Sequence, residues 1–176
     1  MLRSGPLAKF GHNHVVTSRD LTGHLYVHAR TELTRFVIFV PVAGFIVDDE
    51  AARRQAGPQF PPGVPEEDKA ATRANMLGKA VLDAASHSHV EVRSVAITAA
   101  TPGVEVLAAI TLRDVTQRIQ MPVTVTRTAE QIRARGVFEL RQTDFGITPF
   151  SVALGAVSVA DSVRVRFEIV AHRESA

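Results

Sequence analysis

Apolar and polar residues alternate with a period of two along most of this chain, as they do in half-buried β-strands. The clearest segment runs from Asp161 to Arg173, and its apolar face comprises Val163, Val165, Phe167, Ile169 and Ala171. A second segment runs from Gln131 to Arg141, and its apolar face comprises Ile132, Ala134, Gly136, Phe138 and Leu140. Both segments therefore predict strands that turn one face toward an apolar interior.

Shorter segments with the same alternation fill much of the remaining sequence. They are Thr22–Arg30, Leu33–Val47, Val90–Ala99, Val104–Arg113 and Ile119–Thr128. Turn-forming residues separate them, for example Thr101-Pro102-Gly103 and Asp48-Asp49. Many short strands at this spacing are typical of a sandwich or a barrel.

Two neighbouring segments, residues 48–64 and about 65–86, depart from this alternation. Glycine and proline are frequent from Gln55 to Val64, so the first segment is expected to be a surface loop. Pro65 suits the first position of a helix, and the three acidic residues after it suit the positive end of a helix dipole. Apolar residues then recur at helical spacing, namely Ala70, Ala74, Leu77 and Val81, with Met76 beside them. One helix is therefore expected over about 65–86.

Length and composition place these elements in one globular domain. The chain has 176 residues, of which 45% are hydrophobic and 22% charged, and this favours a single domain spanning residues 1–176. The apolar stretches are too interrupted to span a membrane. The net charge is only +2 and the arginines are spread along the chain, so a nucleic-acid partner is not predicted.

Cysteine usage and the amino terminus bear on chemistry and location. The chain contains no cysteine, which excludes disulfides, thiolate nucleophiles and sulfur-ligated metals. Met1 to His14 includes no apolar run of the kind that an export signal needs. As written, the chain is therefore expected to remain in the cytoplasm, and a periplasmic location is expected if its amino terminus is truncated.

Four of the seven histidines lie in GHNHVVTSRDLTGHLYVH, residues 11–28. On a strand, His12 and His14 would share one face, a spacing that lets two imidazoles meet one metal ion. Asp20, the only nearby carboxylate, is expected in a turn. A third ligand could come from His24, His28 or the pair His87 and His89, but nothing in the sequence requires any of them to approach. Two interpretations remain open. One is a His-dependent metalloprotein on a β-barrel that uses His12 and His14. The other is a protein without a metal, in which the imidazoles lie at a rim and pair with carboxylates or contact a ligand's head group.

Motifs of common enzyme classes are missing from the chain. It contains no Gly-x-Ser-x-Gly, no Walker loop, no Gly-x-Gly-x-x-Gly and no His-Glu-x-x-His. Asp144-Phe145-Gly146 matches the magnesium-binding triplet of protein kinases, but none of the other kinase signatures accompanies it. The chain is therefore not predicted to be an enzyme, and no cofactor is predicted.

The carboxyl-terminal part of the chain carries a family resemblance. RQTDFGITPFSVALGAVSVADSVRVRFEIVAHR, residues 141–173, resembles the closing segment of the YceI-like family of lipocalin-like, polyisoprenoid-binding proteins, with its Asp-Phe-Gly-Ile turn and Val-x-Asp-x-Val-x-Val-x-Phe strand. Residues 73–97 are similar to the family's helix, Asp-containing turn and next strand, and residues 107–125 to its strand, tight turn and strand. Gly-His-x-His near the amino terminus resembles the opening of one branch of the family.

This resemblance implies a mainly β protein, an antiparallel lipocalin-like β-barrel of about eight strands with one flanking α-helix. Its apolar lumen would take an isoprenoid chain, and its function would be non-catalytic transport or sequestration of a polyisoprenoid or quinone-type lipid. The composition agrees, because a chain with no Trp, one Tyr and nine Phe leaves room inside a small barrel. The family's first strand is mostly missing, so an open sheet edge is expected, at which a homodimer could form.

The lumen and its mouth provide the candidate site residues. Those expected to line the lumen are Phe138, Leu140, Phe145, Val165, Phe167, Ile169, Met76 and Leu77. Each of them also fits a closed apolar core, and the two alternatives stay open. The head group of the lipid is expected to meet polar side chains, for which the candidates are Arg141, Arg73, Lys79, His12 and His14. The alternative for the arginines and the lysine is that they are solvated surface charges.

Overall fold

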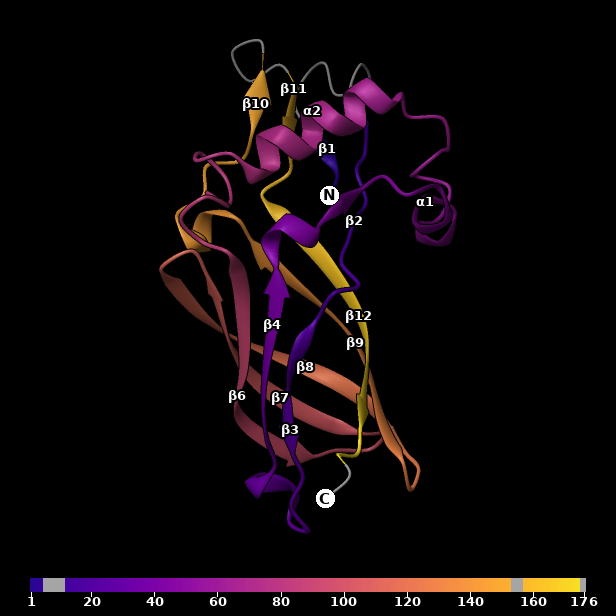
Figure 1. Cartoon of the computed structure of the whole chain (residues 1–176), viewed down its shortest axis with the longest axis vertical. Helices are drawn as coiled ribbons and strands as arrows, with labels where there is room; N and C mark the ends of the chain where they lie inside the picture. Colours follow the sequence, from indigo (N-terminus) through magenta and orange to yellow (C-terminus); the bar gives the residue numbers. More distant parts are fainter. Residues whose placement is uncertain (5–11, 153–156, 175–176) are drawn as a thin grey trace.

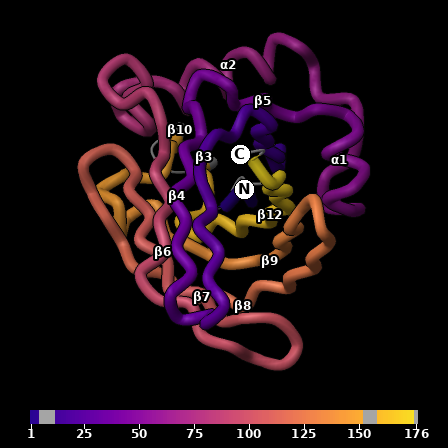
Figure 2. The backbone as a smooth tube through the Cα atoms, turned by 60° about the horizontal axis from the view of Figure 1, so that its bottom comes forward, coloured from indigo at the N-terminus to yellow at the C-terminus, as the bar shows by residue number. Residues whose placement is uncertain are grey.

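A seven-stranded antiparallel sheet forms the body of the protein (Figure 1). The computed structural model describes residues 1–4, 12–152 and 157–174. The strands follow the order β12-β9-β8-β7-β6-β4-β3. Their bounds are β3 Thr22–Tyr26, β4 Arg35–Pro41, β6 His89–Ala99, β7 Val104–Leu112, β8 Val115–Arg127, β9 Gln131–Arg141 and β12 Ser162–His172. Figure 2 shows that the sheet is strongly curved, with a concave and a convex face. The predicted mainly β antiparallel fold is confirmed.

The curled sheet has two edges, β12 and β3, and within the described residues no ladder joins them. The sheet is therefore a half-barrel of seven strands, whereas the sequence predicted a barrel of about eight. An edge strand presents unpaired backbone groups that another chain can pair with. The homodimer expected from the sequence stays a prediction.

The two small sheets and both helices gather at the end of the sheet opposite the carboxyl terminus (Figure 1). A three-stranded sheet joins β1 (Arg3–Ser4), β11 (Val157–Val159) and β10 (Ser151–Val152), and a second small sheet pairs β2 (Val16–Thr17) with β5 (Ile46–Val47). The strand expected over Leu33–Val47 is divided, because the 3-10 turn η3 (Val42–Gly44) separates β4 from β5. Two further 3-10 turns are η2 (Thr31–Leu33) and η4 (Thr143–Phe145).

The helix expected over about 65–86 is shorter than predicted. Helix α2 spans Glu66–Leu77 and ends at Gly78, whose backbone N–H donates to the Asn75 carbonyl. Glycine is a poor helix former, and the chain continues in turns with Asp83 at a left-handed φ of 45°. Val81 therefore packs against the core from a turn.

The loop expected over 48–64 contains a second helix, so the prediction of one flanking helix was wrong. Helix α1 spans Glu50–Ala56, and the Asp49 side chain accepts a hydrogen bond of 2.9 Å from the Ala52 backbone N–H. The sequence pattern predicts only a turn at Asp48-Asp49, although aspartate is also a strong helix N-cap. The glycine- and proline-rich residues 57–64 contain no helix or strand, as predicted.

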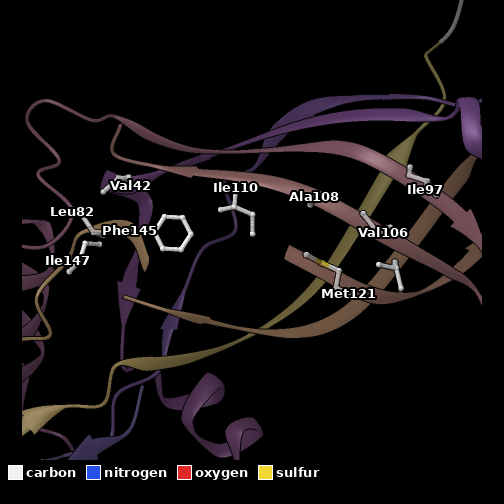
Figure 3. Close-up of a cluster of buried hydrophobic side chains, with 10 residues drawn as sticks. Val42, Leu82, Ile97, Val106, Ala108, Ile110, Met121, Phe145 and Ile147 are labelled. Atoms are coloured by element: carbon white, nitrogen blue, oxygen red, sulfur yellow. The ribbon is translucent and has the colours of Figure 1, made fainter. Parts of the chain in front are cut away.

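The fully buried core occupies the concave side of the sheet and its helix end. It consists of Val42, Leu82, Ile97, Val106, Ala108, Ile110, Met121, Val123, Phe145 and Ile147. Figure 3 shows Val42, Leu82, Phe145 and Ile147 grouped together, whereas Ile97, Val106 and Met121 lie farther along the strands. Most closely grouped are therefore the core residues at the place where the turn that follows α2 and the η4 turn contact the sheet.

Candidate functional site

The concave face of the sheet carries the apolar side of the long strands. In the β9–β12 ladder Val165 lies opposite Phe138, and Ile169 lies opposite Ala134. Side chains alternate between the two faces of a strand, so all four point to one side. The intervening residues lie on the convex side, where Arg135, Arg166 and Glu168 are exposed and Val137 is half-buried. The predicted alternation thus produces a sheet with an apolar concave face and a charged convex face.

Much of the concave face is only partly buried. Phe36, Val92, Phe138, Leu140 and Phe167 pack against the core cluster but keep part of their surface exposed. The rings of Phe138 and Phe167 have centroids 6.3 Å apart. An apolar concave surface that the chain's own side chains do not fully cover can receive an apolar ligand.

The structure places all eight predicted lining residues in or beside the interior, but in different environments. Phe145 is 1% exposed and belongs to the closed core, so for this residue the core alternative holds. Those packed against the core while partly buried are Phe138, Leu140, Phe167, Met76 and Leu77. Val165 and Ile169 are half-buried on the concave side of β12. Ligand contact by the partly buried residues stays a prediction.

A cavity of about 150 Å³ lies where the amino-terminal segment meets α2. Its described lining consists of Met1, Leu2, Arg3, His12, His14, Thr72, Asn75, Met76, Val81, Gln142, Phe150, Ser158 and Val159. Two predicted head-group residues, His12 and His14, thus lie beside the predicted lining residue Met76. This described lining includes two imidazoles and a guanidinium but no carboxylate.

A buried ionic network holds one side of this cavity. The Asp48 side chain has no exposed surface, and its Oδ2 atom lies 2.6 Å from Nδ1 of His14. Its Oδ1 atom accepts hydrogen bonds from Nη1 of Arg53 at 2.5 Å and from the Val15 backbone N–H at 2.8 Å. Arg53 is also buried, and its guanidinium donates to the carbonyls of Asn13 and Pro61. The network therefore ties α1 to the segment that carries His14.

The hydrogen bonds determine the ionisation of Asp48. Burial alone would raise the pKa of this carboxyl group, because it disfavours the charged form. The hydrogen bonds from His14, Val15 and Arg53, together with the charge of His14, outweigh burial and hold the pKa of Asp48 below its ordinary value. Asp48 is therefore a carboxylate that orients the His14 ring through Nδ1, which leaves Nε2 on the opposite side of the ring.

The histidine pair does not form a metal centre with other described residues. The ring centroids of His12 and His14 are 6.4 Å apart and the rings are nearly perpendicular. Nδ1 of His14 already bonds to Asp48. In the described part of the chain no group of three or more metal-ligating side chains could hold an ion. Among the described residues, no third side chain joins His12 and His14 to form a metal site.

The three cationic head-group candidates lie in different places. Arg73 donates to the carbonyls of Phe45 and Ala43, at 3.1 Å and 2.7 Å, so its guanidinium supports the turn that contains η3. Lys79 is exposed in the turn after α2. Arg141 lines a second cavity of about 230 Å³, between β8 and β9, together with Arg118. These three cations therefore do not form a single cluster with His12 and His14.

Sequence reasoning missed Asp48 and Arg53. The pattern predicts a turn at Asp48 and a surface loop around Arg53. Asp48 does have a left-handed φ of 56°, which fits the turn interpretation, but its side chain points into the protein. His14 and Asp48 are 34 positions apart in the sequence, so no local pattern indicates that they form a hydrogen bond.

Comparisons with known proteins bear on the family and the fold. The sequence profile of the YceI-like domain matches residues 7–171. The fold is similar to that of BcnA from Burkholderia cenocepacia, with a TM-score of 0.65 and 18% identity over 86% of this chain and 84% of BcnA. It is also similar to a YceI protein from Campylobacter jejuni, with a TM-score of 0.67 and 10% identity over 92% of this chain and 85% of that protein. A search of curated proteins finds no significant match. Among the described residues, no helix is long and apolar enough to cross a membrane.

Proposed function

Because this chain belongs to the YceI-like domain family, we propose that it binds a long apolar isoprenoid-type lipid against the concave face of its sheet and transports or sequesters it unchanged. The single observation that carries the proposal is the incompletely buried apolar surface inside the half-barrel. Such a surface is unfavourable in water unless a ligand covers it.

The dimensions of the sheet suit an extended chain. Strands β6, β9 and β12 have 11 residues each, and a strand of that length spans about 36 Å. Each methylene that leaves water for an apolar surface contributes about 0.8 kcal/mol. A long isoprenoid chain lying along these strands would therefore be held by burial alone, without specific polar contacts.

His14 is the side chain best placed to bind the head group of this lipid. Asp48 fixes Nδ1, and the His14 ring lines the cavity beside Met76 of α2. In the neutral ring with a proton on Nδ1, Nε2 accepts a hydrogen bond from an alcohol, and in the protonated ring it donates to a quinone or phosphate oxygen. His12, on the same cavity, supplies a second polar contact. Arg141 and Lys79 lie elsewhere and remain secondary candidates.

Solvent extraction and mass spectrometry test the proposal directly. The protein is purified without detergent, extracted with organic solvent and examined for a co-purifying isoprenoid. Fluorescence titration with all-trans-retinol, an isoprenoid alcohol, then measures binding by the delipidated protein. Saturable retinol binding and recovery of the lipid in unmodified form are expected. Absence of both a bound lipid and retinol binding would contradict the proposal.

A His14→Gln variant tests the head-group assignment separately. Loss of the Nε2 contact is expected to weaken retinol binding about tenfold, the upper range for one hydrogen bond. Binding of squalene, which has no head group, should be unchanged. His24→Gln is the matched control, because His24 is exposed on β3 and is absent from the described lining of the cavity. Equal weakening for both ligands would contradict a head-group role for His14.

A further inference from the structure

The seven-stranded sheet is split along part of the boundary between β8 and β9. Strand β8 pairs with β7 from Val115 to Val123, but it pairs with β9 only from Val123 to Arg127. On β9, Gly136 is the last residue in that ladder, although β9 stays paired with β12 as far as Arg141. Residues 115–122 of β8 and 137–141 of β9 thus have no ladder between them.

Pro122 provides a reason for the end of this ladder. A Cβ atom added to Gly136 would lie 3.0 Å from the Pro122 carbonyl oxygen, so this carbonyl faces β9. In an antiparallel ladder the N–H and the carbonyl of one residue point to the same neighbour. Proline has no N–H, and the position of Pro122 therefore cannot donate to β9. The ladder stops at the residue where a donor is missing.

The split contains a cavity whose rim is polar and whose floor is apolar. The cavity has a volume of about 230 Å³. Its apolar lining comes from Ile119, Leu140 and Phe145, and its polar lining from Gln117, Arg118, Glu139, Arg141, Asp144 and Ser162. Leu140 belongs to the concave face, because it lies opposite Val163 in the β9–β12 ladder. The floor of the cavity is thus built from side chains that face the interior.

Within the described residues, the η4 turn and side chains close the split in place of a ladder. The η4 turn places Phe145 in the lining of this cavity, with its ring in the core beside Val42 and Ile147 (Figure 3). A hydrogen bond of 2.6 Å from Nε2 of Gln117 to the Asp144 carbonyl connects β8 to this turn. The turn is held from the other side by Asp161, whose carboxylate accepts hydrogen bonds from the Thr143 backbone N–H at 2.9 Å and from the Thr143 hydroxyl at 2.8 Å. Movement of η4 would break these local bonds, but it would break no part of a ladder between β8 and β9.

We propose that the split between β8 and β9 is the lateral passage through which an apolar chain enters and leaves the half-barrel, with Phe145 as the side chain that closes it. The proposal rests on the proposed lipid-binding function. Ile119 and Leu140 form the apolar path, and the η4 turn moves outward with Phe145 when the passage opens. Helix α2 and the core residues beneath it cover the interior at the end where η4 lies, so the split is the gap in the sheet beside this covered end.

Cross-linking the two strands tests the passage. Continuing the β8–β9 register beyond Val123 and Gly136 would place Gln120 opposite Glu139. The chain has no cysteine, so a Gln120→Cys, Glu139→Cys variant can be joined by a flexible bis-maleimide that contains a reducible disulfide. The cross-link is expected to slow both association and dissociation of all-trans-retinol at least about tenfold, with little change in Kd, because it obstructs the path and leaves the bound state intact. Reduction of the cross-linker should restore both rates.

A matched cross-link controls for general stiffening. Leu107 lies opposite Gln120 in the continuous β7–β8 ladder, so a Leu107→Cys, Gln120→Cys variant takes the same reagent without bridging the split. Its retinol rates should stay unchanged. Equal slowing in both variants, or unchanged rates in the first, would overturn the passage. If the unmodified protein bound no retinol, the lipid-binding function itself would be refuted and the passage with it.

A second variant tests the passage without cross-linking. Gln117→Ala removes the hydrogen bond to the η4 turn and should speed retinol dissociation about three- to tenfold, as expected when one hydrogen bond no longer opposes opening. Gln120→Ala, on the same strand but outside the described lining of this cavity, should leave dissociation unchanged. Equal dissociation rates for Gln117→Ala and the unmodified protein would contradict closure by η4.

Discussion

Nδ1 of His14 lies 2.6 Å from Oδ2 of Asp48, a carboxylate with no exposed surface. The same carboxylate binds Arg53, whose side chain is 1% exposed. One buried acid therefore neutralises the guanidinium on α1 and orients the imidazole beside the α2 cavity. The stability of the fold and the geometry of the candidate head-group site thus depend on the same side chain.

Removal of Asp48 should destabilise the protein strongly. Asp48→Ala leaves Arg53 buried without its carboxylate, and such a loss typically costs about 3–5 kcal/mol of unfolding free energy. Urea denaturation followed by circular dichroism measures the change. Glu50→Ala is the control, because Glu50 is partly exposed and its nearest cations lie 3.9 Å and 4.0 Å away. That variant should lose less than about 1 kcal/mol. Equal losses of unfolding free energy in the two variants would show that the buried network stabilises the protein no more than an exposed ion pair does.

Stability should fall in acid because of Asp48. Its pKa is lower in the folded protein than in the unfolded chain, so the unfolded chain binds more protons as the pH falls. The stabilisation is present above the ordinary aspartate pKa and is lost as the pH falls through the lower folded value. Unfolding free energies measured between about pH 5 and pH 2 should decline less steeply for Asp48→Asn than for the unmodified protein. Parallel curves would contradict this assignment.

A methyl group at Gly136 should disturb the junction of β8, β9 and β12. A Cβ atom there would lie 2.5 Å from Cζ of Phe167 and 3.0 Å from the Pro122 carbonyl oxygen. Gly136→Ala should therefore cost about 1–3 kcal/mol of unfolding free energy, the range for overpacking. Adding Phe167→Leu, which removes the ring, should recover part of the loss in a thermal or urea unfolding measurement. Additive losses in the double variant would show that the ring is not the obstacle.

The sheet could be predicted from the sequence because its signal is local. The segments Gln131–Arg141 and Asp161–Arg173 were expected as strands, and β9 and β12 occupy Gln131–Arg141 and Ser162–His172. Alternation with period two needs only neighbouring residues, and both strands keep one apolar side throughout. The same local signal places Phe138, Val165 and other predicted residues on the concave face.

The candidate site could be predicted only in part, because its geometry depends on distant contacts. His14 was expected to meet a carboxylate at a rim, yet nothing in the pattern selected Asp48 or suggested that Arg53 would be buried. Phe145 was expected to line the lumen, but its burial in a closed core depends on Val42 and Leu82, which are far away in sequence. Pro122 is the one residue in the sequence that indicates where the β8–β9 ladder ends. It does so only when the register of the two strands is known.

Ligand binding should be sensitive to the concave face and insensitive to the convex face of the same strand. Val165 faces the interior opposite Phe138, whereas its neighbour Arg166 is exposed on the other side of β12. Val165→Asn places an amide against the bound apolar chain, and an amide buried without partners costs about 1–3 kcal/mol. The Kd for all-trans-retinol should therefore rise at least about fivefold, measured by fluorescence titration. Arg166→Asn introduces the same side chain on the convex face and should leave the Kd unchanged. If both variants bound retinol as tightly as the unmodified protein, the ligand would have to lie elsewhere than along β12.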